Sequence, residues 1–229
     1  MFAYRDTREG GVGSPGAVHV AFTDVQLDLA EAAPDREDAL GRLEAAIEVP
    51  IARMHQVHGI RVADVTQPRQ VEPEADSLVT AEPAVALLVR VADCVPVVLA
   101  DPRAGLLAVA HAGRLGMAEG VVPRTVERLR SRGAVRLTAW VGPHICGRCY
   151  EVPEEMRADV SSRVPQSWSE TRWGTPGLDL GAGVRAQLLA GGCEVVDVPG
   201  CTLEDTRLHS YRRDGAAAGR FGGLVWREA

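Results

Sequence analysis

The sequence lacks the features of membrane, secreted and nucleic-acid-binding proteins. No apolar run approaches the about 20 residues of a membrane span, and no N-terminal stretch is typical of a signal peptide. The net charge of −6 at pH 7 provides no general attraction to nucleic acid. Without an export signal, the five cysteines are expected to be reduced thiols. We therefore expect a cytoplasmic protein with no membrane or nucleic-acid partner.

The chain also lacks internal repeats and recognisable linkers, so its 229 residues predict a single domain. Hydrophobic residues make up 46% of the sequence, which suffices for a large core without disulfide bonds. Residues 1–16 are rich in glycine and charge, and we expect them to be loosely ordered. Either a monomer or a homodimer is compatible with this composition.

Short apolar segments alternate with amphipathic ones along the chain, which indicates a mixed α/β (α+β) fold. Gly59 is expected to supply a positive φ to a tight turn between strands at 53–57 and 61–65. Pro123 lies inside one predicted helix, which either kinks or begins there. Further strands are predicted at 18–22, 85–91, 95–100, 106–110, 137–141, 193–198 and 224–226, and helices at 35–47, 117–130, 154–164 and 180–189.

His58, Cys94 and His111 each follow a short apolar segment, where a strand would deliver them to one rim of the fold. Two imidazoles and one thiolate can hold zinc and leave its fourth position open, as catalytic zinc requires. The separations of 36 and 17 residues match no zinc finger, so the fold would have to assemble the site. Spacing alone leaves open a second interpretation, in which these are core histidines and a buried free cysteine.

Short motifs around these residues occur in a specific order along the chain. They are QVHG (56–59), ADSLVT (75–80), ADCVPV (92–97), HAG (111–113), CYEV (149–152), CT (201–202) and SYRRDG (210–215). This series resembles the family of zinc-dependent purine nucleoside phosphorylases formerly called multicopper polyphenol oxidoreductases or laccase-domain proteins. The resemblance implies that His58, Cys94 and His111 bind Zn²⁺, with copper as an alternative metal. It also implies one laccase domain over 1–229, with an α/β/β/α layered fold of mixed sheets similar to cysteine-hydrolase-like deamidase toxins.

The resemblance implies a cytoplasmic enzyme that uses phosphate to cleave adenosine, inosine or methylthioadenosine. Adenosine deamination at the same metal is a second implied activity. Asp93 is a candidate for orienting a ligand histidine through its far N–H. Of the two adjacent arginines in the 210–215 motif, at least one is expected to pair with Asp214, and Arg212 is expected to face inward, where it could donate to an anion such as phosphate. The full set of predicted substrate contacts is Gln56, Asp93, Arg114, His144, Cys149 and Arg212.

Three alternatives remain open from the sequence. One is a metal-free cysteine hydrolase or deamidase with Cys94 as nucleophile and a histidine as base. Another is a metal-binding protein that has lost turnover. The third is a copper oxidase with an axial methionine, Met54 or Met117. Six histidines are too few for multicopper oxidation.

Two departures from the family pattern affect the pocket wall and not the metal ligands. After residues 22–24 the usual Gly-Gly-Val-Ser loop is missing, and the usual HAGWRG motif is HAGRLG at 111–116. Cys146 and Cys149 form a C-x-x-C pair, which suggests a redox dithiol or half of a structural zinc site. A structural zinc needs a second close pair. Cys193 and Cys201 are eight residues apart, so we interpret the first pair as incidental.

Overall fold

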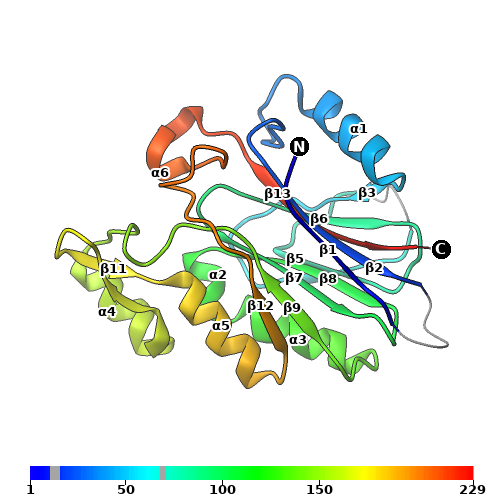
Figure 1. Ribbon diagram of the computed structural model, residues 1–229. Helices are drawn as coiled ribbons and strands as arrows, with labels where there is room; N and C mark the ends of the chain where they lie inside the picture. Colours follow the sequence, from blue (N-terminus) through cyan, green and yellow to red (C-terminus); the bar gives the residue numbers. More distant parts are fainter. Residues whose placement is uncertain (11–15, 68–70, 229) are drawn as a thin grey trace.

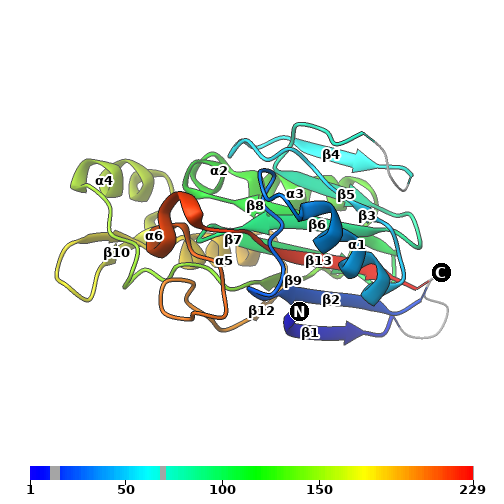
Figure 2. The ribbon, with the colours of Figure 1, turned by 90° about the horizontal axis from the view of Figure 1, so that it is seen from above.

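Two mixed β-sheets form the centre of the protein, as the computed structural model of residues 1–10, 16–67 and 71–228 shows (Figure 1 and Figure 2). In spatial order, the five-stranded sheet contains β1 (Phe2–Arg8), β2 (Val18–Thr23), β13 (Phe221–Arg227), β6 (Ala86–Val91) and β3 (Ile51–Ala52). The six-stranded sheet contains β12 (Glu194–Asp197), β9 (Thr138–Val141), β7 (Val95–Asp101), β8 (Leu106–Ala112), β5 (Ser77–Thr80) and β4 (Val62–Val65). Parallel pairs occur at β3–β6, β4–β5 and β9–β12, and the remaining pairs are antiparallel.

Helices cover the outer faces of both sheets. On the five-stranded sheet, α1 (Arg36–Ile47) packs Leu43 against Leu88 and Leu224 in one apolar cluster. On the six-stranded sheet lie α2 (Arg114–Glu119), α3 (Val121–Ser131) and α5 (Leu180–Ala190). Between the sheets, side chains such as Phe22 and Trp140 form a third cluster. The mixed α/β fold and its four layers agree with the sequence prediction, whereas the likeness to deamidase toxins stays a prediction.

Smaller elements extend from the end of the six-stranded sheet. They are α4 (Glu154–Arg163), the short 3-10 turn Pro165–Ser167, the hairpin of β10 (Trp168–Glu170) and β11 (Pro176–Leu178), the one-turn helix α6 (Tyr211–Asp214), and the 3-10 turn Gly215–Ala217. Figure 1 places α6 above the hairpin and the loops beside it. This end of the molecule carries the loops that build the site described below.

The structure differs from the sequence predictions near the N-terminus and around Pro123. Phe2–Arg8 is not loosely ordered: it forms an edge strand whose side chains alternate between half-buried and exposed, and it pairs with β2. The rest of that segment, residues 11–15, lies outside the described residues. The helix predicted over 117–130 does not run from Met117, because Gly120 adopts a φ of 95° between α2 and α3. Of the two alternatives, a kink or a start near Pro123, the structure confirms the start near Pro123. Pro123 then lies in the first turn of α3, where proline needs no hydrogen-bond partner for its nitrogen.

The turn at 57–59 also differs from its prediction. The positive φ belongs to His58, at 62°, and not to Gly59. The strand predicted at 53–57 does not form, since β3 covers only Ile51–Ala52. Strands β3 and β4 also belong to different sheets, so the turn is not a hairpin. Among the described residues, no helix combines the length and the apolar character needed to cross a membrane.

Candidate functional site

His58, Cys94 and His111 come together at one end of the two sheets. His58 lies in the loop between β3 and β4, Cys94 lies where the chain crosses from β6 to β7, and His111 lies on β8. Their nitrogen and sulfur ligand atoms are all within 4.8 Å of one another. The Cys94 Sγ is 3.9 Å from Nε2 of His58, and the two imidazole centroids are 4.6 Å apart. The fold therefore assembles the predicted triad from three separate segments.

Gly113 leaves the space that a bound ion would need beside these ligands. A Cβ at this position would lie 2.8 Å from Cδ2 of His58 and 3.1 Å from Sγ of Cys94. It would also lie 3.6 Å from Nε2 of His111. The donor set, two imidazole nitrogens and one thiol sulfur around an open centre, fits zinc with one position free.

Asp76, which is fully buried, holds two of the ligands in place. Its Oδ1 lies 2.8 Å from Nδ1 of His111, so Nε2 of that ring faces Cys94. The same carboxylate accepts backbone N–H bonds from Val57, His58 and Gly59 at 3.2, 2.9 and 2.7 Å. Three successive N–H groups that point at one anion explain why His58 adopts a left-handed φ. We had expected Asp93 to orient a histidine, but Asp76 makes this contact.

The charges in the triad favour a thiolate. Burial opposes ionisation of Cys94, but the charge of His111 and hydrogen bonds from both histidines lower its pKa to about 6. Burial likewise disfavours the protonated His111 ring, yet the Cys94 thiolate and the Asp76 carboxylate raise its pKa to about 9. Asp76 stays ionised, since its hydrogen bonds from His111 and Gly59 outweigh burial and lower its pKa. The thiolate is the form of cysteine that binds metals.

A cavity of about 700 Å³ opens over the triad. Its volume falls within the range of small-molecule sites, about 300 to 1,000 Å³. Arginines and tyrosines line it together with the three ligands, so it offers cationic and aromatic surfaces beside the candidate metal position. The lining residues that matter here are Glu31, Gln56, His58, Arg90, Asp93, Cys94, His111, Tyr150, Tyr211, Arg212 and Arg220.

Asp93 fastens the 202–212 segment to the strand end that carries Cys94. Its Oδ1 accepts the hydroxyls of Thr202 and Ser210 at 2.6 and 2.7 Å, and its Oδ2 accepts the backbone N–H of Arg212 at 2.6 Å. Asp93 itself has a φ of 85°. Its carboxylate therefore positions the cavity wall and is already occupied by these three donors.

The two adjacent arginines have different roles, as the sequence suggested. Arg213 makes a two-point contact with Asp214 at 2.9 and 2.8 Å and donates to Thr202 O, so it shapes the loop. Arg212 lines the cavity, where its guanidinium lies 5.1 Å from the Tyr150 ring centroid. One of its nitrogens donates to Glu151 O at 2.9 Å. Arg212 is exposed but lies at the cavity, and its contact with substrate stays a prediction.

Other predicted contacts divide into two groups. Gln56 lines the cavity, but its amide also makes a paired bond with the backbone of Arg90, at 2.8 and 2.9 Å. Arg114 does not line it and lies beside the Tyr150 hydroxyl, where its charge and hydrogen bond oppose the rise in the Tyr150 pKa that burial causes. His144 and Cys149 are also absent from the lining among the described residues. His144 packs against α5, and its Nδ1 lies 2.8 Å from Gly142 O.

The sequence analysis did not predict some of the residues that line the cavity. Arg90 is 6% exposed, lies within an apolar strand and contacts Glu31 at 2.6 Å. A charged residue inside an apolar segment was the available signal, since buried charges need partners. Tyr211 lies in the 210–215 motif, but the arginines of that motif were chosen as the pocket contacts. Arg220 lies outside every motif and gave no signal.

Comparisons with known proteins agree with this geometry. A family model described as "Multi-copper polyphenol oxidoreductase laccase" matches residues 3–228, and the chain belongs to that family. A purine nucleoside phosphorylase of Streptomyces griseus is 47% identical over 236 residues, with 92% of this chain and 95% of the relative covered. One of Streptomyces coelicolor is 52% identical over 179 residues, with 76% and 73% covered.

Two crystal structures share the fold. A Neisseria meningitidis protein has a TM-score of 0.83 at 26% identity, covering 98% of this chain and 99% of its own. YlmD from Geobacillus stearothermophilus has the same score and identity, with 97% and 94% covered. The structural likeness therefore covers nearly all of this chain.

Proposed function

We propose that this chain is a purine nucleoside phosphorylase that holds zinc on His58, Cys94 and His111. The observation that carries the proposal is that this ligand set and the guanidinium of Arg212 line one cavity. Relatives named purine nucleoside phosphorylase, at 47% and 52% identity, support the same reaction class. Such a site takes a neutral nucleoside and an anionic co-substrate.

In the proposed reaction, a phosphate oxygen bonds to the anomeric carbon of the sugar as the bond from that carbon to the purine nitrogen breaks. The phosphate proton passes to the leaving base, so the products are the free base and ribose 1-phosphate. When bound, zinc would supply a Lewis acid that polarises a substrate oxygen. Asp76 would keep His111 in the tautomer with its proton on Nδ1 and its Nε2 free as a ligand.

Arg212 is the proposed phosphate contact. Among the described residues, only one of its guanidinium nitrogens has a protein partner, Glu151 O, and the ring of Tyr150 supports its face. The other N–H groups can therefore donate to an anion. Tyr150 and Tyr211 offer flat surfaces for a purine.

A metal-free cysteine hydrolase or deamidase is the second candidate, because Cys94 Sγ lies 3.9 Å from the His58 imidazole. Copper oxidase chemistry with an axial thioether has less support. Neither Met54 nor Met117 lines the cavity in the described part of the chain.

Product analysis tests the proposal. Zinc-loaded protein should release hypoxanthine from inosine, and adenine from adenosine, only when phosphate is present, together with ribose 1-phosphate. Adenosine deamination, if the same site performs it, should not need phosphate, because water replaces it. Zinc-loaded protein that releases no base from either nucleoside would rule out the phosphorylase assignment. If the protein still converts a nucleoside after zinc is removed, and does so without phosphate, the metal-free cysteine hydrolase or deamidase would be favoured.

A further inference from the structure

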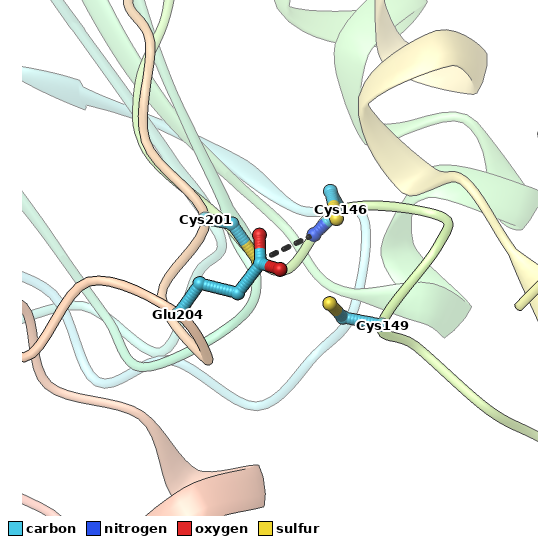
Figure 3. Close-up of side chains that lie close together, drawn as sticks. All are labelled: Cys146, Cys149, Cys201 and Glu204. Atoms are coloured by element: carbon cyan, nitrogen blue, oxygen red, sulfur yellow. Dashed lines mark hydrogen bonds between the residues drawn. The ribbon is translucent and has the colours of Figure 1, made fainter. Parts of the chain in front are cut away.

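A second group of metal-ligand side chains lies outside the cavity. It consists of Cys146, Cys149, Cys201 and Glu204, whose ligand atoms are all within 4.8 Å of one another. Figure 3 shows the three sulfurs and the carboxylate turned toward a common point. None of the four belongs to the described cavity lining, so this thiol cluster is separate from the triad. The C-x-x-C pair thus lies beside a third thiol and a carboxylate, which the sequence interpretation of an incidental pair did not anticipate.

Sheet topology brings the two halves of the cluster together. Strands β9 and β12 are parallel neighbours, paired up to Val141 and Asp197. The loops that follow parallel neighbours leave the same edge of a sheet. These loops, residues 142–153 and 198–210, are further joined by a bridge between His144 and Cys201. The eight-residue separation of Cys193 from Cys201 is thus irrelevant, because the partner of Cys201 lies on the other loop.

Each loop contributes a turn that places residues three apart side by side. In the first, the Cys149 N–H donates to Cys146 O at 2.9 Å. In the second, the Glu204 N–H donates to Cys201 O at 3.0 Å. The Cys146 N–H also points at Cys201 Sγ, at 3.5 Å. A C-x-x-C turn facing a C-x-x-E turn reproduces the two close pairs that a structural zinc site requires.

We propose that Cys146, Cys149, Cys201 and Glu204 bind a structural zinc ion. Tetrahedral zinc with Zn–S bonds of about 2.3 Å places its ligand atoms about 3.8 Å apart, so small inward movements complete the site. Arg172 lies 2.5 Å from Glu204 and offsets part of the negative charge of the ligand set. Soft sulfur ligands select thiophilic metals over magnesium or calcium.

The same residues are less suited to a simple disulfide. A disulfide joins two sulfurs, whereas here a third sulfur and a carboxylate converge on the same point. A carboxylate contributes nothing to a disulfide bond, but it can serve as the fourth ligand of a zinc ion. The described structure has all five cysteines as free thiols.

This zinc would fasten together two loops that form the cavity wall. The first loop carries Tyr150, directly after Cys149, and the second leads into Arg212. Thr202, directly after Cys201, donates to Asp93, directly before Cys94. The second site would therefore have a structural role: it would fix the two loops that line the cavity without contacting the substrate.

Zinc content per folded chain tests the proposal without reference to activity. Protein purified under reducing conditions and reconstituted with zinc should hold about two ions per chain. Cys94→Ala should keep about one, Cys201→Ser should also keep about one, and the double variant should keep none. Cys193→Ser is the matched control, because its buried thiol lies in the core outside both ligand sets, and it should keep both ions. A folded Cys94→Ala protein without zinc overturns the proposal.

Thiol labelling of the unmodified chain covers the case in which Cys201→Ser fails to fold. In zinc-loaded protein, Cys146 and Cys201 should resist alkylation, and a chelator should make them reactive, as mapped by mass spectrometry. Cobalt bound to Cys94→Ala should give a thiolate charge-transfer band, whereas the Cys94→Ala, Cys201→Ser double variant should not. Labelling that is indifferent to chelator, or a disulfide among the three thiols in freshly reduced protein, overturns the proposal.

Discussion

Asp76 Oδ1 lies 2.8 Å from Nδ1 of His111, and solvent reaches almost none of either side chain. The carboxylate fixes the ring so that Nε2 points at Cys94, and its bonds to the 57–59 turn fix the backbone of His58. One acidic side chain thus orients two of the three candidate ligands.

Asp76→Asn should weaken zinc binding at the triad by about 10- to 100-fold, the usual effect of removing a carboxylate behind a ligand histidine. The asparagine keeps the size of the side chain but removes the charge that holds the Nδ1 proton. Zinc affinity is measured by competition with a chromogenic chelator in the Cys201→Ser background. Asp159→Asn, an exposed acid paired with Arg163, should leave affinity unchanged. If Asp76→Asn and Asp159→Asn bound zinc with equal affinity, Asp76 would not stabilise the metal ligands.

Gly113→Ala should displace the triad. The new methyl group would lie 2.8 Å from His58, closer than side chains tolerate, and 3.1 Å from Cys94, a tight contact. We expect loss of most triad zinc and of activity, with little change in melting temperature. Gly41→Ala is the control, since no atom lies within 4 Å of the added carbon. In the helix it should stabilise the fold by about 0.5–1 kcal/mol. Normal zinc content in Gly113→Ala would contradict the cradle described above.

Arg212→Ala should reduce kcat/KM for phosphate-dependent base release by roughly 10- to 150-fold, which corresponds to about 1.5–3 kcal/mol for one charge-assisted hydrogen bond. The loss should be in the apparent affinity for phosphate more than for nucleoside. Arg163→Ala, which removes an exposed arginine on α4, should have no effect. An unchanged phosphate dependence in Arg212→Ala would move the anion contact to Arg90 or Arg220.

The ionised carboxylate of Asp101 should make the stability of the fold depend on pH. Burial alone would raise its pKa, but the N–H groups of Arg136, Val135, Ala104 and Arg103 lower it below its ordinary value of 3.8. Because folding favours the ionised form, the Asp101 carboxylate contributes to the free energy of unfolding. The contribution is complete above the pKa that Asp101 has in the unfolded state, and it is lost as the pH falls through its pKa in the folded state.

Asp101→Asn places an amide N–H₂ against backbone donors, and it should therefore cost about 1–3 kcal/mol of unfolding free energy at pH 7. Urea denaturation should show the difference between the two proteins narrowing as the pH falls below 3.8. If the difference in unfolding free energy stayed constant below pH 3.8, the charge of Asp101 would not be the source of its stabilising effect.

Local patterns in the sequence predicted the inner strands and the triad. β6, β7 and β8 are short and buried along their whole length; Cys94 follows β6, and His111 lies near the end of β8. His58 instead lies in the loop between β3 and β4. The first strand was missed because only one of its faces is half-buried, and its charged residues resemble a loop. The left-handed φ was assigned to Gly59 from residue type, but the carboxylate of Asp76 imposes it on His58.

Long-range partners could not be predicted from the sequence. Asp76 and His111 are 35 residues apart and meet because β5 and β8 are antiparallel neighbours. Cys146 and Cys201 are 55 residues apart and meet because β9 and β12 are parallel neighbours. Both contacts follow from strand order, which no motif in this chain encodes.

Titration of metal-free protein with zinc tests the central claim most directly. The experiment compares the unmodified chain with Cys94→Ala, so that the 142–153 and 198–210 loops are unaltered in both proteins except near Cys94, and follows base release from inosine at saturating phosphate. The account predicts that activity rises in proportion to the zinc that the unmodified chain binds and Cys94→Ala does not, about one ion per chain, whereas Cys94→Ala stays inactive at every zinc level. Full activity before zinc is added, or a triad filled with zinc and no base release, would contradict it.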